Sequence, residues 1–446
     1  MKDGILPPLL EVENLSVSFG RGPAEVRAVE GVSFTLRRGE TLALVGESGS
    51  GKSVTALSLL QLLPYPHARH PSGSVRLHGQ ELIGAPEAVL RSVRGDRIAI
   101  VFQEPMTSLN PLHSIARQIG EVLDIHKGLT GAAARERVEE LLRLVGLPEA
   151  VDRLHALPHE LSGGQRQRVM IAMALANEPD ILIADEPTTA LDVTIQAQIL
   201  KLLKDLQARF GMAVLFITHD LSIVRKIADT VCVMKDGRIV ERKPVSLIMA
   251  GAEHPYSRML LASEPRGEPV RAAPDAPEVM AADDLKVWFP LGGGLFGSPK
   301  RHVKAVDGVS ISVREGHTVG VVGESGSGKT TLGKALLRLI RSDGRIRFMG
   351  RAIEGLSTGE LRPLRREMQI VFQDPYGSLS PRLSVGQIVE EGLIVHGLGG
   401  NRTERRERIA LALEEVGLDP NTQDRYPHEF SGGQRQRIAI ARALAL

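Results

Sequence analysis

The chain carries the same three motifs twice, in the same order, and this duplication limits its fold more than any other feature. Residues 45–52, Val-Gly-Glu-Ser-Gly-Ser-Gly-Lys, recur unchanged at 322–329. Ile-Val-Phe-Gln ends at Gln103 and again at Gln373, and Ser-Gly-Gly-Gln-Arg-Gln-Arg begins at positions 162 and 431. The copies are spaced by about 270 residues throughout, so the sequence predicts two tandem copies of one domain.

A proline-rich stretch separates the two copies. Residues 263–277 contain four prolines among alternating charges, a composition that opposes regular secondary structure. We therefore expect a first domain over residues 1–262, a linker over 263–278 and a second domain over 279–446. The glycine-rich insert at 292–299 predicts a surface loop in the second domain.

The second copy is shorter than the first. A counterpart of Asp185, displaced by the same spacing, would fall beyond residue 446. We expect the chain to be a fragment or a truncated product whose second domain stops after its Ser-Gly-Gly-Gln helix. Such a domain lacks core strands and is expected to be poorly stable.

Composition excludes several classes of function. Lys and Arg number 55 against 53 Asp and Glu, a net charge of +2, and aromatic residues are scarce, so a nucleic-acid partner is not expected. The single cysteine, Cys232, predicts a buried strand thiol and no iron–sulfur or zinc site. The sequence shows no secretory signal and no run of 18 apolar residues, so any membrane role is expected to be peripheral.

The first repeated motif has the form of a phosphate-binding loop. An apolar strand is expected over 41–45 and a helix over 54–63, with the glycine-rich segment between them. Glycines let successive N–H groups point at phosphate, Lys52 is placed for the β- and γ-phosphates, and Ser53 is placed to bind Mg²⁺. The alternative is a plain glycine–serine turn. The loop comprises Gly46, Glu47, Ser48, Gly49, Ser50, Gly51, Lys52 and Ser53, and its second copy comprises Gly323, Glu324, Ser325, Gly326, Ser327, Gly328, Lys329 and Thr330.

Two adjacent carboxylates follow a second apolar strand, expected over 181–185. Asp185 is predicted to bind Mg²⁺ through water, and Glu186 to polarise the attacking water. The alternative is a pair of carboxylates that only caps a helix.

A third strand over 213–217 leads to His219, and a strand over 98–102 leads to Gln103. We predict that His219 contacts the γ-phosphate and holds the water, and that Gln103 reaches the Mg²⁺ and the water. Taken alone, each residue also fits an ordinary structural role at the end of a strand.

The Ser-Gly-Gly-Gln motif opens a predicted helix over 166–176 and offers a second set of exposed N–H groups. A second anion site in one domain is explained if it serves a partner domain. Asp192 begins an amphipathic helix that is predicted to pack on the sheet, and residues 188–192 could signal across an interface. The two copies of the motif are Ser162, Gly163, Gly164 and Gln165, and Ser431, Gly432, Gly433 and Gln434.

Together these residues resemble the ABC transporter ATPases over nearly the whole chain. The resemblance implies two tandem α/β P-loop domains, each with a RecA-like core sheet, an antiparallel β part and a helical signature subdomain, the second copy being incomplete. It implies ATP and Mg²⁺ as cofactors, with each ATP held between one domain's P-loop and the other domain's signature. It assigns adenine stacking to Phe19 and Phe289, and the Q-loop to Gln103 and Gln373. It assigns the signature motif to Ser162 and Ser431, the D-loop to Asp192 and the H-loop to His219. In the second copy it makes Thr330 and Gln373 metal ligands.

The resemblance narrows at the end of the first copy. The tail Glu-His-Pro-Tyr-Ser-Arg-Met-Leu-Leu at 253–261 is similar to that of the oligopeptide and dipeptide importer ATPases, and segments 289–294 and 302–310 are similar to their partner subunit. The fusion most resembles the Yej-type importers of peptides and microcin C, with the glutathione importers as the near alternative.

This family implies two integral-membrane permease subunits and an extracytoplasmic substrate-binding protein as partners, at the cytoplasmic face of the bacterial inner membrane. It also implies that residues 104–125 contact the permease.

Two other classes are built on the same kind of domain, and the first of them also has it duplicated. A soluble tandem ATPase of the translation-factor type typically has a long charged helical linker, whereas this linker is short and rich in proline. A nucleic-acid maintenance ATPase would need a coiled-coil insertion or zinc cysteines, and neither is seen in the sequence. In the importer interpretation, the site on Lys52 has all its groups once Ser431 faces it, whereas the site on Lys329 lacks its own carboxylates and histidine.

Overall fold

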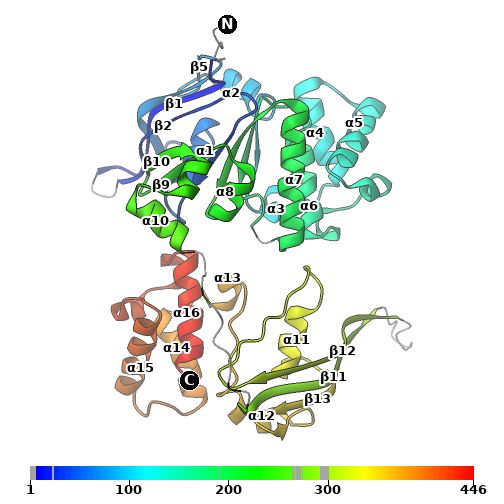
Figure 1. The fold of residues 1–446 in the computed structure, drawn as a ribbon, viewed down its shortest axis with the longest axis vertical. Helices are drawn as coiled ribbons and strands as arrows, with labels where there is room; N and C mark the ends of the chain where they lie inside the picture. The colour runs from blue at the N-terminus through cyan, green and yellow to red at the C-terminus, as the bar shows by residue number, and fades with distance from the viewer. Residues whose placement is uncertain are drawn as a thin grey trace. The chain divides into compact units, whose positions relative to one another are not determined.

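The computed structural model describes residues 7–22, 25–189, 191–263, 267, 273, 275–291 and 301–446. The loop expected at 292–299 and most of the expected linker lie outside the described residues. The chain divides into two compact units, Met1–Gly267 and Glu268–Leu446, and each is described by itself (Figure 1).

A six-stranded sheet forms the centre of the first unit among its described residues, in the order β10-β9-β3-β8-β7-β6. The strands from β9 to β6 are parallel, and β10 pairs antiparallel at the edge. Every residue of β3 and β7 is buried, as expected for short apolar strands that are covered on both faces. The strands are β3 (Thr41–Val45), β6 (Ile98–Val101), β7 (Ile181–Asp185), β8 (Ala213–Thr218), β9 (Thr230–Lys235) and β10 (Arg238–Pro244).

An antiparallel sheet in the order β2-β1-β4-β5 packs beside it. Leu10 and Phe34 of this sheet share one hydrophobic cluster with Leu59 of the first helix and with Leu44 of β3. The cluster therefore joins the antiparallel sheet to the strand and helix that flank the phosphate loop. The strands are β1 (Leu10–Phe19), β2 (Val26–Leu36), β4 (Ala68–Leu77) and β5 (Gln80–Glu81).

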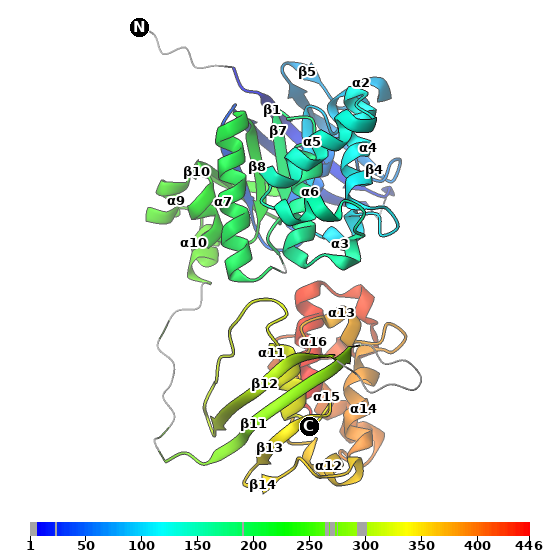
Figure 2. The ribbon, with the colours of Figure 1, turned by 90° about the vertical axis from the view of Figure 1, so that its right-hand side faces the viewer.

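Helices cover the remaining faces, and α4, α5 and α6 pack against one another in a helical subdomain (Figure 2). The helices are α1 (Lys52–Leu59), α2 (Glu87–Val93), α3 (Pro105–Ser108), α4 (Ile115–Lys127), α5 (Gly131–Leu144), α6 (Gly163–Ala174), α7 (Val193–Phe210), α8 (Leu221–Ile227), α9 (Val245–Ala250) and α10 (Pro255–Ala262), with 3₁₀ turns η2 (Pro148–Arg153) and η3 (Pro158–Glu160).

The predicted bounds of two helices need correction. The helices predicted at 54–63 and 166–176 are α1 and α6, and each begins earlier than predicted. The last residues of each glycine-rich motif already form the first helical turn, because Gly51 and Ser162 occupy the N-cap positions. Helix α1 also ends before residue 63, since Gln61 has a left-handed backbone with φ of 50°.

The second unit has an antiparallel sheet in the order β12-β11-β13-β14 and a helical part. Its strands are β11 (Glu278–Leu291), β12 (Arg301–Arg314), β13 (Asp343–Phe348) and β14 (Arg351–Ala352). Its helices are α11 (Lys329–Leu336), α12 (Thr358–Leu364), α13 (Pro375–Ser378), α14 (Val385–Val395), α15 (Arg402–Glu415) and α16 (Gly432–Leu444), with 3₁₀ turns η4 (Pro420–Asp424) and η5 (Pro427–Glu429).

The parallel core sheet does not form among the described residues of the second unit. Residues 318–322 correspond to β3 yet are not a strand, and Val322 is 95% exposed whereas Val45 is fully buried. In the first unit β3 is held by β8 and β9 on either side. Counterparts of those two strands do not occur within the 446 residues, so the apolar segment has no such neighbours among the residues that the structure describes.

The cysteine lies where the sequence predicted. Cys232 is fully buried in β9, and burial raises the pKa of its thiol to about 12.

Within the described residues, no cluster of three His, Cys, Asp or Glu side chains could hold a metal ion. No helix in the described part of the chain has the length and apolar character needed to cross a membrane.

Candidate functional site

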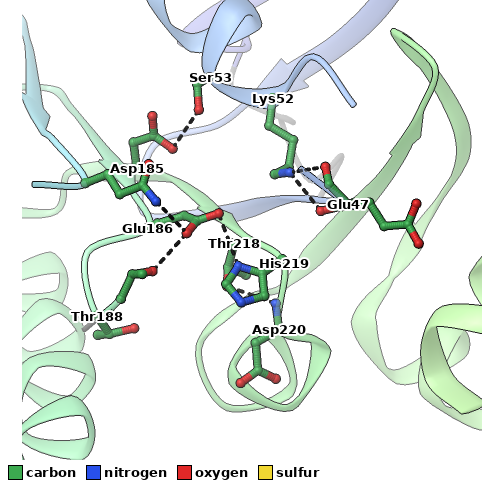
Figure 3. A network of polar contacts seen from close by, with 12 residues as sticks. Glu47, Lys52, Ser53, Asp185, Glu186, Thr188, Thr218, His219 and Asp220 are labelled. Carbon is green, nitrogen blue, oxygen red and sulfur yellow. Dashed lines mark hydrogen bonds and ion pairs between the residues drawn. The ribbon is translucent and has the colours of Figure 1, made fainter. Parts of the chain in front are cut away.

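The phosphate loop lies between β3 and α1 and folds around the side chain of Lys52 (Figure 3). The Nζ atom of Lys52 donates to the carbonyl oxygens of Gly46 and Glu47, both at 2.7 Å, and approaches Ser50 Oγ at 3.3 Å. The side chain is almost fully buried, and burial lowers the pKa of Lys52 despite the nearby carboxylates, with Glu186 the strongest of them.

Two glycines of this loop are required by space. A Cβ at Gly46 would lie 2.2 Å from the carbonyl oxygen of Met234, in the neighbouring strand β9. A Cβ at Gly51 would lie 2.6 Å from the carbonyl oxygen of Ala28, and this residue also has φ of 98°. The loop can therefore approach the backbone of two strands only without side chains at these positions.

Asp185, the first of the two adjacent carboxylates, contacts the end of the phosphate loop. Asp185 ends β7 and is almost fully buried, and its Oδ1 accepts a hydrogen bond from Ser53 Oγ at 3.2 Å. Burial raises the pKa of Asp185, and the charge of Glu186 acts in the same direction, whereas the hydrogen bond from Ser53 opposes the shift. The two side chains present neighbouring oxygen atoms, the ligand type that Mg²⁺ prefers.

Glu186 follows β7 in a left-handed backbone conformation, with φ of 45°. Its amide donates to the carbonyl oxygen of Ile217 at 3.0 Å, which fixes this turn to β8. A non-glycine residue in this region is strained by about 1–3 kcal/mol, and such strain concentrates at functional sites. The turn directs the carboxylate toward the ends of β6 and β8.

Three side chains hold the carboxylate of Glu186. Gln103 Nε2 donates to its Oε2 at 3.1 Å, and Thr189 Oγ1 donates to the same oxygen at 2.9 Å. His219 Nδ1 lies 3.2 Å from Oε1. The predicted catalytic residues Glu186, His219 and Gln103 are therefore joined in one hydrogen-bonded cluster.

Burial acts to raise the pKa of Glu186, but the hydrogen bonds from His219 and Thr189 outweigh it and the pKa lies below its usual range. The hydrogen bond to Glu186 raises the pKa of His219, against partial burial. Both shifts favour an ionised carboxylate beside a protonated imidazole.

The topology explains why these residues meet. Asp185 is the last residue of β7. The other site residues follow the carboxyl ends of the parallel strands β3, β6, β7 and β8, and they are Lys52, Ser53, Gln103, Glu186 and His219. In an open parallel sheet these ends lie at one edge, which is where ligands bind.

The signature residues of the first copy lie elsewhere in that unit. Ser162 is exposed and caps α6, with its Oγ accepting from the Gln165 amide at 3.3 Å, and the packing of Gly164 against Ile195 of α7 leaves no room for a Cβ. Asp192 caps α7 by accepting from the Ile195 amide at 2.9 Å. Phe19 ends β1 and packs partly buried against the core.

The second unit repeats the loop and the cap. Lys329 Nζ donates to the carbonyl oxygens of Gly323 and Glu324 at 2.7 and 2.6 Å and lies 3.3 Å from Ser327 Oγ. Ser431 caps α16 by accepting from the Gln434 amide at 3.3 Å. The side chains of Phe289, Thr330 and Gln373 are exposed.

Sequence reasoning missed two contacts of the site. Thr189 donates to Glu186 from three residues later in the chain, a spacing that could have indicated the contact. Tyr256 Oη accepts a hydrogen bond from the Glu47 amide at 3.0 Å. Nothing in the sequence pattern connects this pair, which lies 209 residues apart.

A glycine-rich loop around a buried lysine, followed by a serine, two carboxylates and a histidine at the ends of parallel strands, defines a P-loop nucleoside triphosphatase. The family model described as ABC transporter matches residues 29–189 and 306–446. The chain belongs to this family: it is an ATP-binding, ATP-hydrolysing subunit of an ABC transporter.

Curated relatives extend over both units. The chain is 62% identical over 446 residues to the peptidoglycan transport ATP-binding protein YejF of Agrobacterium fabrum, covering 100% of this chain and 82% of that protein. It is 53% identical to the uncharacterized ABC transporter ATP-binding protein YejF of Escherichia coli K12, covering 98% and 83%. It is 47% identical to the glutathione import ATP-binding protein GsiA of Salmonella paratyphi A, covering 98% and 75%. These names refer to transport, which agrees with the transporter interpretation and not with the translation-factor alternative.

Proposed function

We propose that this ATPase drives the import of peptides or peptide-like compounds, the class that includes oligopeptides, dipeptides and microcin C. The similarity that carries the proposal extends over both copies, at 62% identity to a peptidoglycan transport protein. A second relative is named for glutathione import. Glutathione and the stem of peptidoglycan are both peptide-like, so a peptide-type cargo is their common chemistry.

The residues of the first unit fit Mg-ATP. Ser53 and Asp185 present oxygen atoms 3.2 Å apart, and Gln103 adds an amide from the loop after β6, so these three would hold Mg²⁺, Asp185 through water. Bound Mg²⁺ would neutralise charge on the phosphate oxygens. Lys52 would exchange its contacts with the loop carbonyls for the β- and γ-phosphates, since an ammonium donor needs acceptors in either state.

Glu186 would accept the proton of the attacking water. Its lowered pKa keeps the carboxylate ionised, and Gln103 and Thr189 fix the orientation of one of its oxygens. His219 would orient the water and contact the γ-phosphate from the end of β8. A positioned base of this kind accelerates a reaction by about 10²–10⁴.

The signature motifs would close the sites in trans. Ser431 of the second unit would face ATP bound at Lys52, and Ser162 would face ATP bound at Lys329, with Phe19 and Phe289 stacking on adenine. Both serines cap exposed helix starts, where N–H groups favour an anion. Asp192 caps α7, and residues 188–192, which end at this cap, would signal between the domains. We place these domains at residues 1–262 and 279–446, with a linker at 263–278.

The ATP sites on Lys52 and Lys329 differ in the catalytic groups that their own copy of the domain supplies. Lys329, Thr330 and Gln373 would bind phosphate and Mg²⁺ in the second copy, but counterparts of Glu186 and His219 do not occur within the 446 residues. We therefore assign the proposed hydrolysis to the site on Lys52, where these groups are present.

Transport requires a membrane partner. We propose two integral-membrane permease subunits, contacted by residues 104–125, and an extracytoplasmic substrate-binding protein. The chain would lie peripherally at the cytoplasmic face of the bacterial inner membrane, without nucleic acid and without an iron–sulfur cluster.

The test is ATP-dependent uptake of radiolabelled peptides into proteoliposomes that contain the two proposed permease subunits and the substrate-binding protein, with the chain added at the ATP side. We expect uptake that requires Mg-ATP and the binding protein. Uptake of a non-peptide solute with no response to peptides would contradict the assigned cargo.

A further inference from the structure

The phosphate loop is tied to the last helix of the first unit by one hydrogen bond. Tyr256 of α10 is 4% exposed, and its hydroxyl accepts from the Glu47 amide at 3.0 Å. The carbonyl oxygen of the same residue, Glu47, accepts from Lys52 Nζ at 2.7 Å. The tyrosine therefore contacts the same residue whose carbonyl oxygen accepts from the phosphate-binding lysine.

A second set of contacts fixes α10 itself. The carboxylate of Glu241, in β10, accepts from the amides of Glu253 and His254 at 2.8 and 3.1 Å. His254 Nδ1 accepts from the Tyr256 amide at 3.2 Å and so caps the helix. The Lys235 ammonium lies 5.1 Å from the centre of the Tyr256 ring. The phenol is thus held from the helix start and from its ring face.

The second copy of the loop shows what the tyrosine adds. Lys329 makes the same three contacts with its own loop as Lys52 does, at nearly the same distances. A counterpart of Tyr256 does not occur within the 446 residues. The lysine contacts are therefore intrinsic to the loop, and the tyrosine contributes an anchor to the rest of the domain.

We propose that Tyr256 is a positioning residue of the ATP site, which holds the phosphate loop in its binding conformation and ties the affinity for ATP to helix α10. The proposal rests on ATP binding by this family and not on the cargo. An anchored loop samples fewer conformations that cannot bind phosphate. Since apparent affinity falls with the fraction of competent protein, loss of the anchor raises the Kd for ATP.

The test compares Tyr256→Phe with the parent chain, since phenylalanine keeps the ring and removes only the acceptor. Loss of one hydrogen bond predicts a rise of about 3- to 10-fold in the Kd for a fluorescent ATP analogue and in the KM for ATP, with kcat within about twofold. Met259→Ala is the matched control, because Met259 lies on the same helix and is 47% exposed. It should leave both values unchanged.

Glu241→Gln provides a second variant that touches no loop residue. It weakens the acceptor of the 253–254 amides and should raise the Kd for ATP in the same direction as Tyr256→Phe. Melting temperatures show whether each variant is folded. An unchanged Kd in folded Tyr256→Phe, or an equal rise in Met259→Ala, would overturn the proposal. If the parent chain itself fails to bind ATP, the site assignment fails instead, and the proposal with it.

Discussion

His219 Nδ1 lies 3.2 Å from Glu186 Oε1, so the ends of β8 and β7 are joined by a histidine–carboxylate pair (Figure 3). Burial acts to raise the pKa of Glu186, but the hydrogen bonds from His219 and Thr189 lower it, and the hydrogen bond to Glu186 raises the pKa of His219. The pair therefore gives the site a pH dependence that can be measured on the folded protein.

The sign of that dependence follows from the two directions. The raised pKa of His219 contributes stability that is complete below its ordinary value of 6.5 and is lost as pH rises through the folded pKa. The lowered pKa of Glu186 contributes stability that is complete above its ordinary value of 4.5 and is lost as pH falls through the folded pKa. The difference in melting temperature between the parent chain and His219→Gln should be largest between these values and should shrink at alkaline pH. A difference that grows with pH would contradict the pairing.

Removal of the Glu186 charge should separate ATP binding from hydrolysis. Glu186→Gln keeps the shape of the side chain but cannot accept the proton, so hydrolysis should fall by about 10²–10⁴. The Kd for ATP should stay within a few-fold, because Lys52 and Ser53 remain. Steady-state phosphate release and equilibrium binding measure the two effects. Hydrolysis at the parent rate would rule out Glu186 as the base.

The two lysines provide a matched pair, since each makes the same contacts with its own loop. Lys52→Ala should reduce ATP binding at the first site by about tenfold or more, because a charged donor to phosphate is lost. Hydrolysis should fall with it. Lys329→Ala should reduce hydrolysis less in this chain, because the carboxylates and the histidine belong to the first site. Equal losses would show that both sites hydrolyse ATP.

Gly46 should be intolerant of a methyl group. The Cβ of Gly46→Ala would meet the Met234 carbonyl oxygen at 2.2 Å, so the loop or β9 must move, at a cost of about 1–3 kcal/mol. Gly120→Ala is the control, because a Cβ at this position in α4 meets nothing within 4 Å and alanine favours a helix. Thermal unfolding should show a loss for Gly46→Ala and a gain for Gly120→Ala. A neutral Gly46→Ala variant would show that the loop tolerates the shift.

The sequence predicted the local parts of the site well. β3 and β7 begin and end where their apolar runs do, because a strand buried on both faces needs a continuous apolar segment. Lys52, Asp185 and His219 meet because they lie at or just after the carboxyl ends of such strands. Helix starts were misplaced by two or three residues, since capping residues do not show in apolar periodicity.

Long-range contacts were beyond the sequence. The hydrogen bond from Glu47 to Tyr256 depends on how α10 folds back on the loop, and no local pattern encodes that. Residues 318–322 are mostly apolar, as β3 is, yet they are exposed and pair with no strand among the described residues. A strand is stabilised by its neighbours as well as by its own residues.

Ser431 and Ser162 occupy equivalent positions in the two copies and are proposed to serve different sites. Ser431 is proposed to close the hydrolytic site on Lys52, and Ser162 to close the other site. The Oγ of each serine accepts from the amide three residues later at 3.3 Å, so replacing either serine by Arg removes the same helix-capping hydrogen bond. We predict that Ser431→Arg lowers Mg-ATP hydrolysis by about 10²-fold, whereas Ser162→Arg keeps more than about half of it. Full hydrolysis by Ser431→Arg, or a greater loss in Ser162→Arg, would show that Ser431 does not close the site on Lys52.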